Sequence, residues 1–239
     1  QEKDWAKAIE AAGALPDHES LMWRTEVANF HCELAAGALA NSALGEAERH
    51  VDAALAVNPR CVRASLIRGD ICVTQGRDQD ALAAWKRIEN QDPVYLALAA
   101  ERIMEACDRL GRLEEGQQLL RAWLDSHASI DLLDELFRWE MEQQGPKAAY
   151  DLVREELRRN PTLLGLDKLL EAAVLTVPSE QRGDIELVKQ LIHAHTRKVA
   201  RYRCNTCGFK ARQFHWRCPA CGGWETYPPR RTEEFDLTP

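Results

Sequence analysis

The sequence has no long apolar run and few aromatic residues. No stretch approaches the roughly 18 consecutive apolar residues that read as a membrane-spanning helix, so nothing in these 239 residues is predicted to span a membrane. Aromatic residues make up 7% of the chain, whereas Ala, Leu and Glu are abundant. This composition favours helices and argues against an all-β fold.

Motifs of catalysis are also missing. The sequence contains no nucleophile–base motif and no phosphate-binding loop, and a fold alone does not imply a reaction. We therefore predict that the protein is not an enzyme and has no catalytic residue.

Regularly spaced prolines divide the helical sequence. An Asn or Asp precedes each of Pro59, Pro93 and Pro161, and these prolines are 34 and 68 residues apart. These intervals are one and two periods of the tetratricopeptide repeat. Between the prolines, small and aromatic residues stand at the offsets where the two helices of a repeat touch: Gly69, Cys72, Ala81 and Trp85 in residues 62–95, and Leu34, Ala35, Ala47 and Ala54 in residues 28–61.

Weaker repeats follow at 96–129 and 130–163, the second with Gly145-Pro146 as its turn. Residues 4–9 read as the second helix of a repeat, and a final pair at about 163–176 and 184–199 reads as the cap that such arrays need. The chain starts with Gln1, in the middle of the pattern, and we expect the natural protein to extend further toward the N-terminus.

Eight cysteines fall into two groups. Four are scattered through helical sequence, which is typical of buried small side chains and of a reducing compartment: Cys32, Cys61, Cys72 and Cys107. Four others form two C-x-x-C pairs, each followed by Gly: Cys204, Cys207, Cys218 and Cys221.

This second group predicts a closed site of four thiolates around one metal ion. A Gly after each pair permits the tight turn that aims two sulfurs at one ion. The four sulfurs complete the ligand shell, so His193, His195 and His215 are not expected to be ligands. A tetrahedral S₄ site accepts either iron or zinc. The Tyr-x-Cys-x-x-Cys-Gly and Cys-Pro-x-Cys-Gly elements resemble those of rubredoxin, which holds a single iron, and this resemblance implies iron, with zinc as the alternative.

The chain is thus predicted to be mainly α, a tetratricopeptide-type solenoid of helical hairpins over residues 1–199. A small rubredoxin-like or zinc-ribbon metal module follows at 200–229, and residues 230–239 form a tail. Such arrays usually bind a peptide or another protein on the concave surface lined by the first helix of each repeat. Asn29, Arg63 and Glu101 lie near positions of this kind, and a solvated surface role is the alternative for each. Arg212 and Arg217 of the metal module are the other two predicted partner-binding residues.

Charge is divided between the two parts. The chain carries a net charge of −7: residues 198–231 contribute about +7, the preceding helical part about −11, and Glu233, Glu234 and Asp236 the remaining −3. We expect the basic module to pack against its own acidic repeats, with no nucleic acid as a partner. The alternative is an RNA-binding zinc ribbon. In that case the charges of Arg212 and Arg217 would strengthen RNA binding, and Phe209, Trp216 and Trp224 would stack on bases.

A tetratricopeptide array followed directly by a rubredoxin-like module resembles the lipopolysaccharide assembly protein B family, over the whole chain. The resemblance implies attachment to the cytoplasmic face of the bacterial inner membrane by an N-terminal helix outside this chain. It also implies a non-enzymatic adaptor that restrains lipopolysaccharide synthesis. The implied partners are the membrane AAA protease, the deacetylase that commits lipid A synthesis, and an inner-membrane protein that senses lipopolysaccharide. An electron-transfer module on a repeat scaffold is the alternative function.

Overall fold

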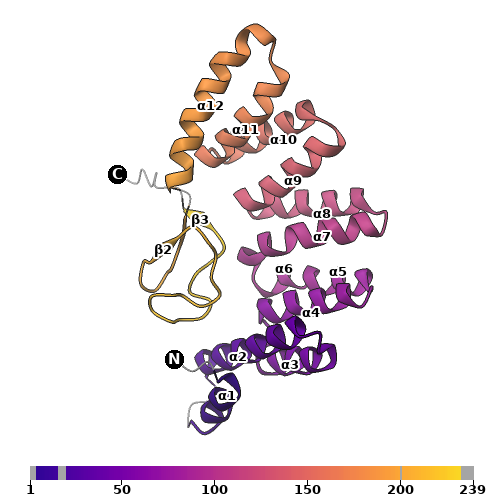
Figure 1. Ribbon diagram of the computed structural model, residues 1–239, viewed down its shortest axis with the longest axis vertical. Coiled ribbons are helices and arrows are strands. Elements are labelled where there is room, and N and C mark those ends of the chain that lie inside the picture. Colours follow the sequence, from indigo (N-terminus) through magenta and orange to yellow (C-terminus); the bar gives the residue numbers. More distant parts are fainter. Residues whose placement is uncertain (1–3, 16–19, 200, 233–239) are drawn as a thin grey trace. The chain divides into compact units, whose positions relative to one another are not determined.

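A computed structural model describes residues 4–15, 20–199 and 201–232, which form helices followed by a small sheet (Figure 1). The helices are α1 Trp5–Gly13, α2 Leu21–Ala40, α3 Leu44–Val57, α4 Val62–Thr74, α5 Asp78–Lys86, α6 Ile88–Gln91, the 3₁₀ turn η1 Pro93–Tyr95, α7 Ala97–Arg109, α8 Leu113–Ser126, α9 Ile130–Gln143, α10 Pro146–Arg159, α11 Leu163–Thr176 and α12 Ser179–Val199. The residues form two compact units, 1–116 and 117–239, with the boundary inside α8.

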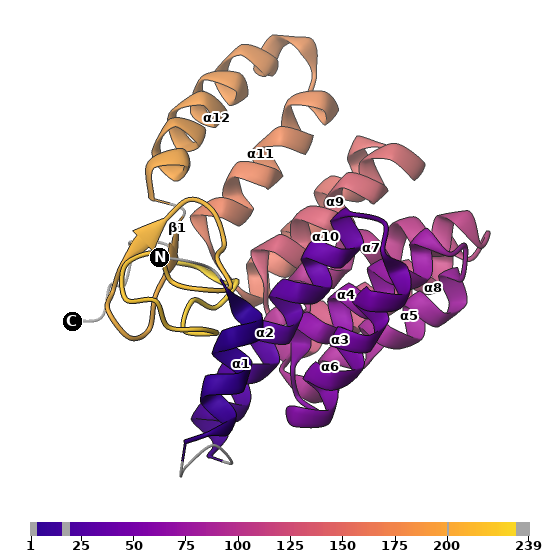
Figure 2. The ribbon, with the colours of Figure 1, turned by 60° about the horizontal axis from the view of Figure 1, so that its bottom comes forward.

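Consecutive helices pack as hairpins within each unit. In the first unit α2 packs on α3 and α4 on α5, and in the second α9 packs on α10 and α11 on α12 (Figures 1 and 2). The predicted mainly helical, tetratricopeptide-type fold is confirmed. Among the helices that the structure describes, none is long and apolar enough to span a membrane.

Close approach of two helices defines the repeat at 62–95. A Cβ atom at Gly69 on α4 would lie 2.0 Å from the indole nitrogen of Trp85 on α5, so the indole occupies the space that any side chain at 69 would need. The same nitrogen donates a hydrogen bond to the carbonyl oxygen of Leu66, at 3.2 Å. In the preceding repeat, Ala35, Ala47 and Ala54 are completely buried. These residues are small because helices meet there.

The Asn-Pro and Asp-Pro corners also join successive repeats. Gln91 donates from its side chain to the carbonyl oxygen of Pro59, at 2.9 Å. Arg60 donates in return to the carbonyl oxygen of Gln91, at 2.8 and 3.1 Å. The carboxylate of Asp92 accepts from the backbone N–H of Val94, at 3.1 Å, and fixes the second corner. The two corners are therefore held in register by side chains that satisfy backbone carbonyls.

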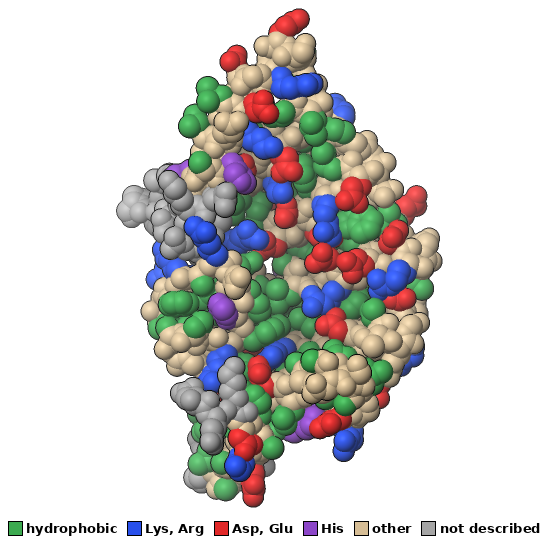
Figure 3. Space-filling view, viewed as in Figure 1, with side chains coloured by type: hydrophobic (Ala, Val, Ile, Leu, Met, Phe, Trp, Pro, Cys, Tyr) green, Lys and Arg blue, Asp and Glu red, His purple; other side chains and the backbone are tan. Residues whose placement is uncertain are grey.

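Ion pairs repeat with the period of the array. Arg102 contacts Asp70 at 2.8 Å, and Arg109 contacts Asp78 at 2.7 Å; these partners lie 32 and 31 residues apart. In the second unit, Lys168 contacts Asp134 at 2.5 Å. Acidic and basic side chains accordingly lie next to one another over the helices (Figure 3). Each exposed pair contributes little alone, about 0–1 kcal/mol, but together they favour one register of the repeats.

The final helical pair differs from the prediction in one respect. Helix α11 covers residues 163–176 as expected, but α12 begins at Ser179 rather than at about 184, and Gly183 lies inside it. No atom outside the local backbone lies within 4 Å of a Cβ placed at Gly183, so this glycine serves no close contact. A helical Gly costs about 1 kcal/mol relative to Ala, which this helix of 21 residues tolerates.

The terminal module is a three-stranded antiparallel sheet in the order β2-β1-β3, with β1 at Arg201–Arg203, β2 at Lys210–Ala211 and β3 at Arg231–Thr232. Strand β3 pairs with β1, so the sheet includes two residues of the predicted tail at 230–239. Sequence did not indicate this strand because two residues carry no periodicity. Tyr227 is completely buried under the sheet, and its hydroxyl donates to the carbonyl oxygen of Tyr202, at 2.9 Å.

We predict that Gly69→Ala destabilises the protein by about 1–3 kcal/mol, because the added methyl group overlaps a rigid, buried indole. The measurement is the midpoint of thermal unfolding, followed by helical circular dichroism. Gly183→Ala is the matched control, since it also adds a methyl group to a helix, and it should be neutral or stabilising by up to about 1 kcal/mol. Equal unfolding midpoints for Gly69→Ala and the wild type would contradict the packing described for this repeat.

Candidate metal centre

The first C-x-x-C pair forms a tight turn closed by backbone hydrogen bonds. Gly208 has φ +74°, a conformation that favours glycine, and its N–H donates to the carbonyl oxygen of Cys204, at 2.9 Å. The N–H of Cys204 donates to the carbonyl oxygen of Phe209, also at 2.9 Å. This turn places Cys204 and Cys207 on the same side of the backbone loop.

The second pair repeats the same geometry. Gly222 has φ +76°, and its N–H donates to the carbonyl oxygen of Cys218, at 2.9 Å. The N–H of Cys218 donates to the carbonyl oxygen of Gly223, at 2.9 Å. The two turns are thus copies of one local structure, 14 residues apart in the sequence.

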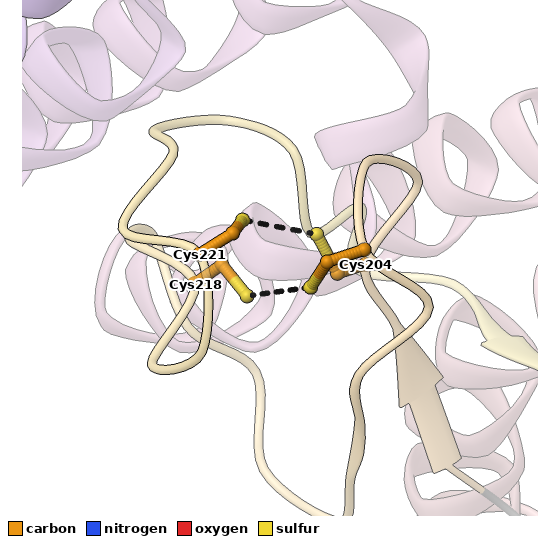
Figure 4. A group of neighbouring side chains, drawn as sticks. Cys204, Cys218 and Cys221 are labelled. Carbon is orange, nitrogen blue, oxygen red and sulfur yellow. Dashed lines mark hydrogen bonds between the residues drawn. The ribbon is translucent and has the colours of Figure 1, made fainter.

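The two turns bring four sulfur atoms into one cluster. The Sγ atoms of Cys204, Cys207, Cys218 and Cys221 all lie within 4.8 Å of one another. The sulfurs of Cys204 and Cys221 are 3.8 Å apart and those of Cys207 and Cys218 are 3.6 Å apart (Figure 4). A tetrahedral site with metal–sulfur bonds of about 2.3 Å has sulfur–sulfur edges of about 3.8 Å. The arrangement therefore fits one tetrahedral ion.

Hydrogen bonds, burial and neighbouring sulfurs shift the pKa values of the first cysteine pair. Burial raises the pKa of Cys204, but the hydrogen bond with the Thr226 hydroxyl and those from the backbone N–H groups of Cys207 and Thr206 outweigh burial and lower that pKa to about 6. The N–H of Phe209 lowers the pKa of Cys207, but burial and the three neighbouring cysteines raise it to about 11. The pKa values of Cys204 and Cys207 are thus shifted in opposite directions. A metal ion binds the thiolate form of cysteine, so coordination would favour the ionised form of both ligands.

The cluster has a buried side and an exposed side. Cys204 and Cys218 are buried, whereas Cys207 and Cys221 are exposed. The ring of His215 packs against Tyr227, with centroids 5.7 Å apart, and among the described residues the metal-type cluster contains cysteines alone. His193 contacts Asp167 at 2.8 Å on the neighbouring helix. A site with four sulfur ligands offers no position for a reactive water.

One carboxylate joins the module to the helical array within the second unit. Asp131, in the first turn of α9, accepts from the Nε of Arg231 at 2.8 Å and from the hydroxyl of Tyr202 at 3.4 Å. Burial raises the pKa of Asp131, and the charge of Arg231 opposes that rise. Packing of the basic module against acidic repeats was predicted, and this ion pair is a contact of that kind.

The sequence did not indicate Asp131 or Thr226 as parts of the site. Asp131 lies 71 residues before Tyr202 in the chain, and no local pattern marks a contact at such a distance. The hydroxyl of Thr226 lies 3.3 Å from Cys204 Sγ. The sequence does not mark Thr226 as part of the site either, because a single Thr after a cysteine pair is common.

The predicted partner-binding residues are placed differently from one another. Asn29 is completely buried and donates to the carbonyl oxygen of Thr25, at 3.0 Å. Arg63 is also buried and pairs with Glu33 at 2.8 Å. Neither residue therefore lies on an open surface of the array. Sequence spacing alone does not distinguish a position that faces the groove from one that faces the interior of the same helix. Glu101 is exposed on α7.

The two module residues in that group also differ. Arg212 is exposed. Arg217 is half-buried, and its Nε donates to the carbonyl oxygen of Gly222, at 2.9 Å. Arg217 thus contributes to the structure of the second turn.

Comparisons with known proteins found similarity for the metal module and for nearly the whole chain. Residues 202–229 match a family described as the rubredoxin metal binding domain. The chain is 27% identical over 230 residues to Lipopolysaccharide assembly protein B of Escherichia coli K12, covering 95% of this chain and 59% of that protein. It is 25% identical over 238 residues to the protein of the same name from Haemophilus influenzae Rd, covering 98% of this chain and 59% of that protein. The resemblance expected from the sequence is confirmed, and the chain spans about 59% of the length of these curated relatives.

Among solved structures, the chain resembles one in the crystal structure of the APC/C hetero-tetramer Cut9-Hcn1. The TM-score is 0.42 and the identity 14%, with 81% of this chain and 38% of that chain covered. At this TM-score the likeness carries no weight for function.

We predict that Cys204→Ser and Cys218→Ser each abolish stoichiometric metal binding, because each removes one of four ligands from the buried side of the cluster. The measurement is elemental analysis of the purified protein. Cys72→Ala, which removes a buried thiol from the array, is the control and should retain the metal. A full complement of metal in both serine variants would contradict a four-cysteine site.

Proposed function

We propose that this chain is a non-enzymatic adaptor that takes part in the control of lipopolysaccharide synthesis. The observation that supports this most strongly is the combination of a helical-hairpin array with a closed four-cysteine module, held to the array through Asp131. The same two parts extend over the 95% of the chain that is similar to proteins named Lipopolysaccharide assembly protein B. An array of repeats offers extended surfaces for protein partners.

The four cysteines hold one metal ion in this proposal. Cys204, Cys207, Cys218 and Cys221 supply four thiolates, and an iron or a zinc ion would tie the two turns together. An iron ion would add the capacity to change oxidation state, whereas a zinc ion would not. The donor set accepts both, so elemental analysis of protein purified from its natural source decides the metal. The adaptor function requires the closed fold of the module with either ion.

The adaptor acts by bringing two partners together. We propose that the protein binds the membrane AAA protease and the deacetylase that commits lipid A synthesis, and that an inner-membrane protein that senses lipopolysaccharide controls this binding. Simultaneous binding raises the effective concentration of the substrate at the protease without any new catalytic group. The location proposed is the cytoplasmic face of the inner membrane. The resemblance supports these assignments.

Exposed charged residues are the candidates for contact with these partners. Glu101 on the array and Arg212 on the module are both exposed, and they carry opposite charges. Asn29 and Arg63 are buried, so a partner role would require their surroundings to open. We therefore propose Glu101 and Arg212 as partner-binding residues ahead of Asn29 and Arg63.

Electron transfer is the second candidate function. Two of the four sulfurs, those of Cys207 and Cys221, are exposed, and the module matches a rubredoxin metal binding domain. This function requires a coloured iron site that can be reduced reversibly, and full activity of a zinc-substituted protein would exclude it. RNA binding is less well supported, because Trp224, one of the three proposed stacking residues, is buried.

We predict that replacing both Cys204 and Cys207 with Ser in the full-length protein lengthens the cellular half-life of the deacetylase severalfold. The physical reason is that the module no longer keeps its fold, so the substrate is no longer held at the protease. The measurement is the amount of deacetylase over time after protein synthesis is blocked.

Cys72→Ala is the control, because it removes a thiol from the array and leaves both metal-binding turns intact. The abundance of each variant is measured in the same samples. If the double variant is as abundant as the wild type and the deacetylase half-life is unchanged, the adaptor proposal is wrong.

A further inference from the structure

Each metal-binding turn carries an arginine immediately before its first cysteine. The segments 203–208 and 217–222 both read Arg-Cys-x-x-Cys-Gly, and they are 14 residues apart. The residues between the cysteines differ, with Asn205 and Thr206 in one turn and Pro219 and Ala220 in the other. The arginine is thus repeated together with the ligands and the glycine, whereas other positions vary.

In the second turn the arginine side chain folds back over the glycine. The Nε of Arg217 donates to the carbonyl oxygen of Gly222, at 2.9 Å, and a Cβ placed at Gly222 would lie 3.5 Å from Arg217 Nη2. The guanidinium carbon also lies 5.6 Å from the centre of the Trp224 ring, a cation–π contact. The guanidinium is therefore held against the turn by a hydrogen bond and by an aromatic ring.

In the first turn the arginine takes the equivalent place with looser contacts. A Cβ placed at Gly208 would lie 3.9 Å from Arg203 Nη2 and 4.0 Å from its Nε. Arg203 is exposed and pairs across the sheet with Lys210. The two arginines thus cover the two glycines in the same way, but the second is more firmly held.

We infer that Arg203 and Arg217 are paired positioning residues of the metal centre, which hold the two turns closed and offset the charge of the thiolates. This inference rests on the metal site proposed above. Four thiolates around a divalent ion carry a net charge of about −2, and two guanidinium groups supply the opposite charge. The hydrogen bond also fixes the carbonyl group of Gly222, the residue whose own N–H donates to the carbonyl oxygen of Cys218. Groups beyond the ligands that orient them typically affect metal affinity by about 10–100-fold.

The alternative is that both arginines are ordinary solvated basic residues of a basic module. Arg212 provides the comparison, because it is an exposed arginine of the same module. Among the described residues, no hydrogen bond, ion pair or cation–π contact joins Arg212 to either metal-binding turn. Replacing Arg212 with an uncharged residue changes the net charge of the module by the same amount as replacing Arg203 or Arg217. It therefore serves as the control for a general effect of charge.

The test measures the rate at which the zinc-loaded full chain loses its ion to a chromophoric chelator in excess. Arg217→Gln should release zinc about 10–100-fold faster than the wild type. Arg203→Gln should show a smaller acceleration, because Arg203 is held less firmly. Arg212→Gln should match the wild type. Release rates of Arg203→Gln and Arg217→Gln equal to that of Arg212→Gln would overturn the inference.

Two further measurements separate a role in charge from general damage to the fold. Arg217→Lys, which keeps the charge but loses the planar hydrogen-bonding group, should release zinc at an intermediate rate. The difference between Arg217→Gln and the wild type should also shrink in molar salt, because salt screens the lost charge. A lysine variant as fast as the glutamine variant, with no effect of salt, would contradict the role in charge.

Zinc content of the wild type, measured first, tests the site itself. Stoichiometric zinc combined with equal release rates would refute the role of the arginines alone. A wild-type chain that takes up no zinc or iron would refute both the metal site and this inference.

Discussion

Repulsion among four thiolate sulfurs is the constraint on which the terminal module depends. The sulfurs lie within 4.8 Å of one another, and like charges this close repel one another unless a cation lies between them. The apolar core of the module is small: it has a cluster of Tyr202, Cys204, Cys218 and Tyr227, with Ala211 and Phe214 packed against it, and the buried Trp224. A core of this size does not stabilise a domain of some thirty residues. The free energy of metal binding is therefore a large part of the free energy of folding of the module.

The metal site and the helical array are connected through the small sheet. Strand β1 leads directly into Cys204, and β3 pairs with β1 through Tyr202 and Arg231. Arg231 and Tyr202 are the two residues that contact Asp131 on α9. Loss of the ion would release Cys204, disturb the β1–β3 pairing and move Arg231 away from a carboxylate whose burial is already unfavourable. The surface shared by the module and α9 would therefore depend on the metal ion held by the four cysteines.

The array is stabilised differently, by close packing and by contacts that recur once per repeat. Gly69 and Trp85 set the distance between two helices, whereas Gln91 and Arg60 set the register of successive corners. Such contacts join neighbours in the stack, so the array does not require the metal for its own fold. This difference explains how one chain combines a scaffold that is independent of metal with a module that depends on it.

Local patterns made much of this structure predictable. The ligands follow from C-x-x-C-Gly spacing because each turn is stabilised within six residues, and the helical hairpins follow from small residues at fixed offsets. Other features were not predictable, for physical reasons. The early start of α12 reflects a helix long enough to tolerate Gly183. The burial of Asn29 and Arg63 depends on packing that single-helix spacing does not encode. The contact of Asp131 with Tyr202 joins residues 71 positions apart.

Hydrogen exchange of the full chain with and without its metal ion tests the central claim most directly. If the ion holds the module together and the module covers the start of α9, removal of the ion should increase amide exchange in residues 202–232 and in the first turn of α9. Exchange in α4 and α5 should stay unchanged, because Gly69 and Trp85 pack without the metal. Unchanged exchange in residues 202–232 after complete removal of the ion would contradict the account.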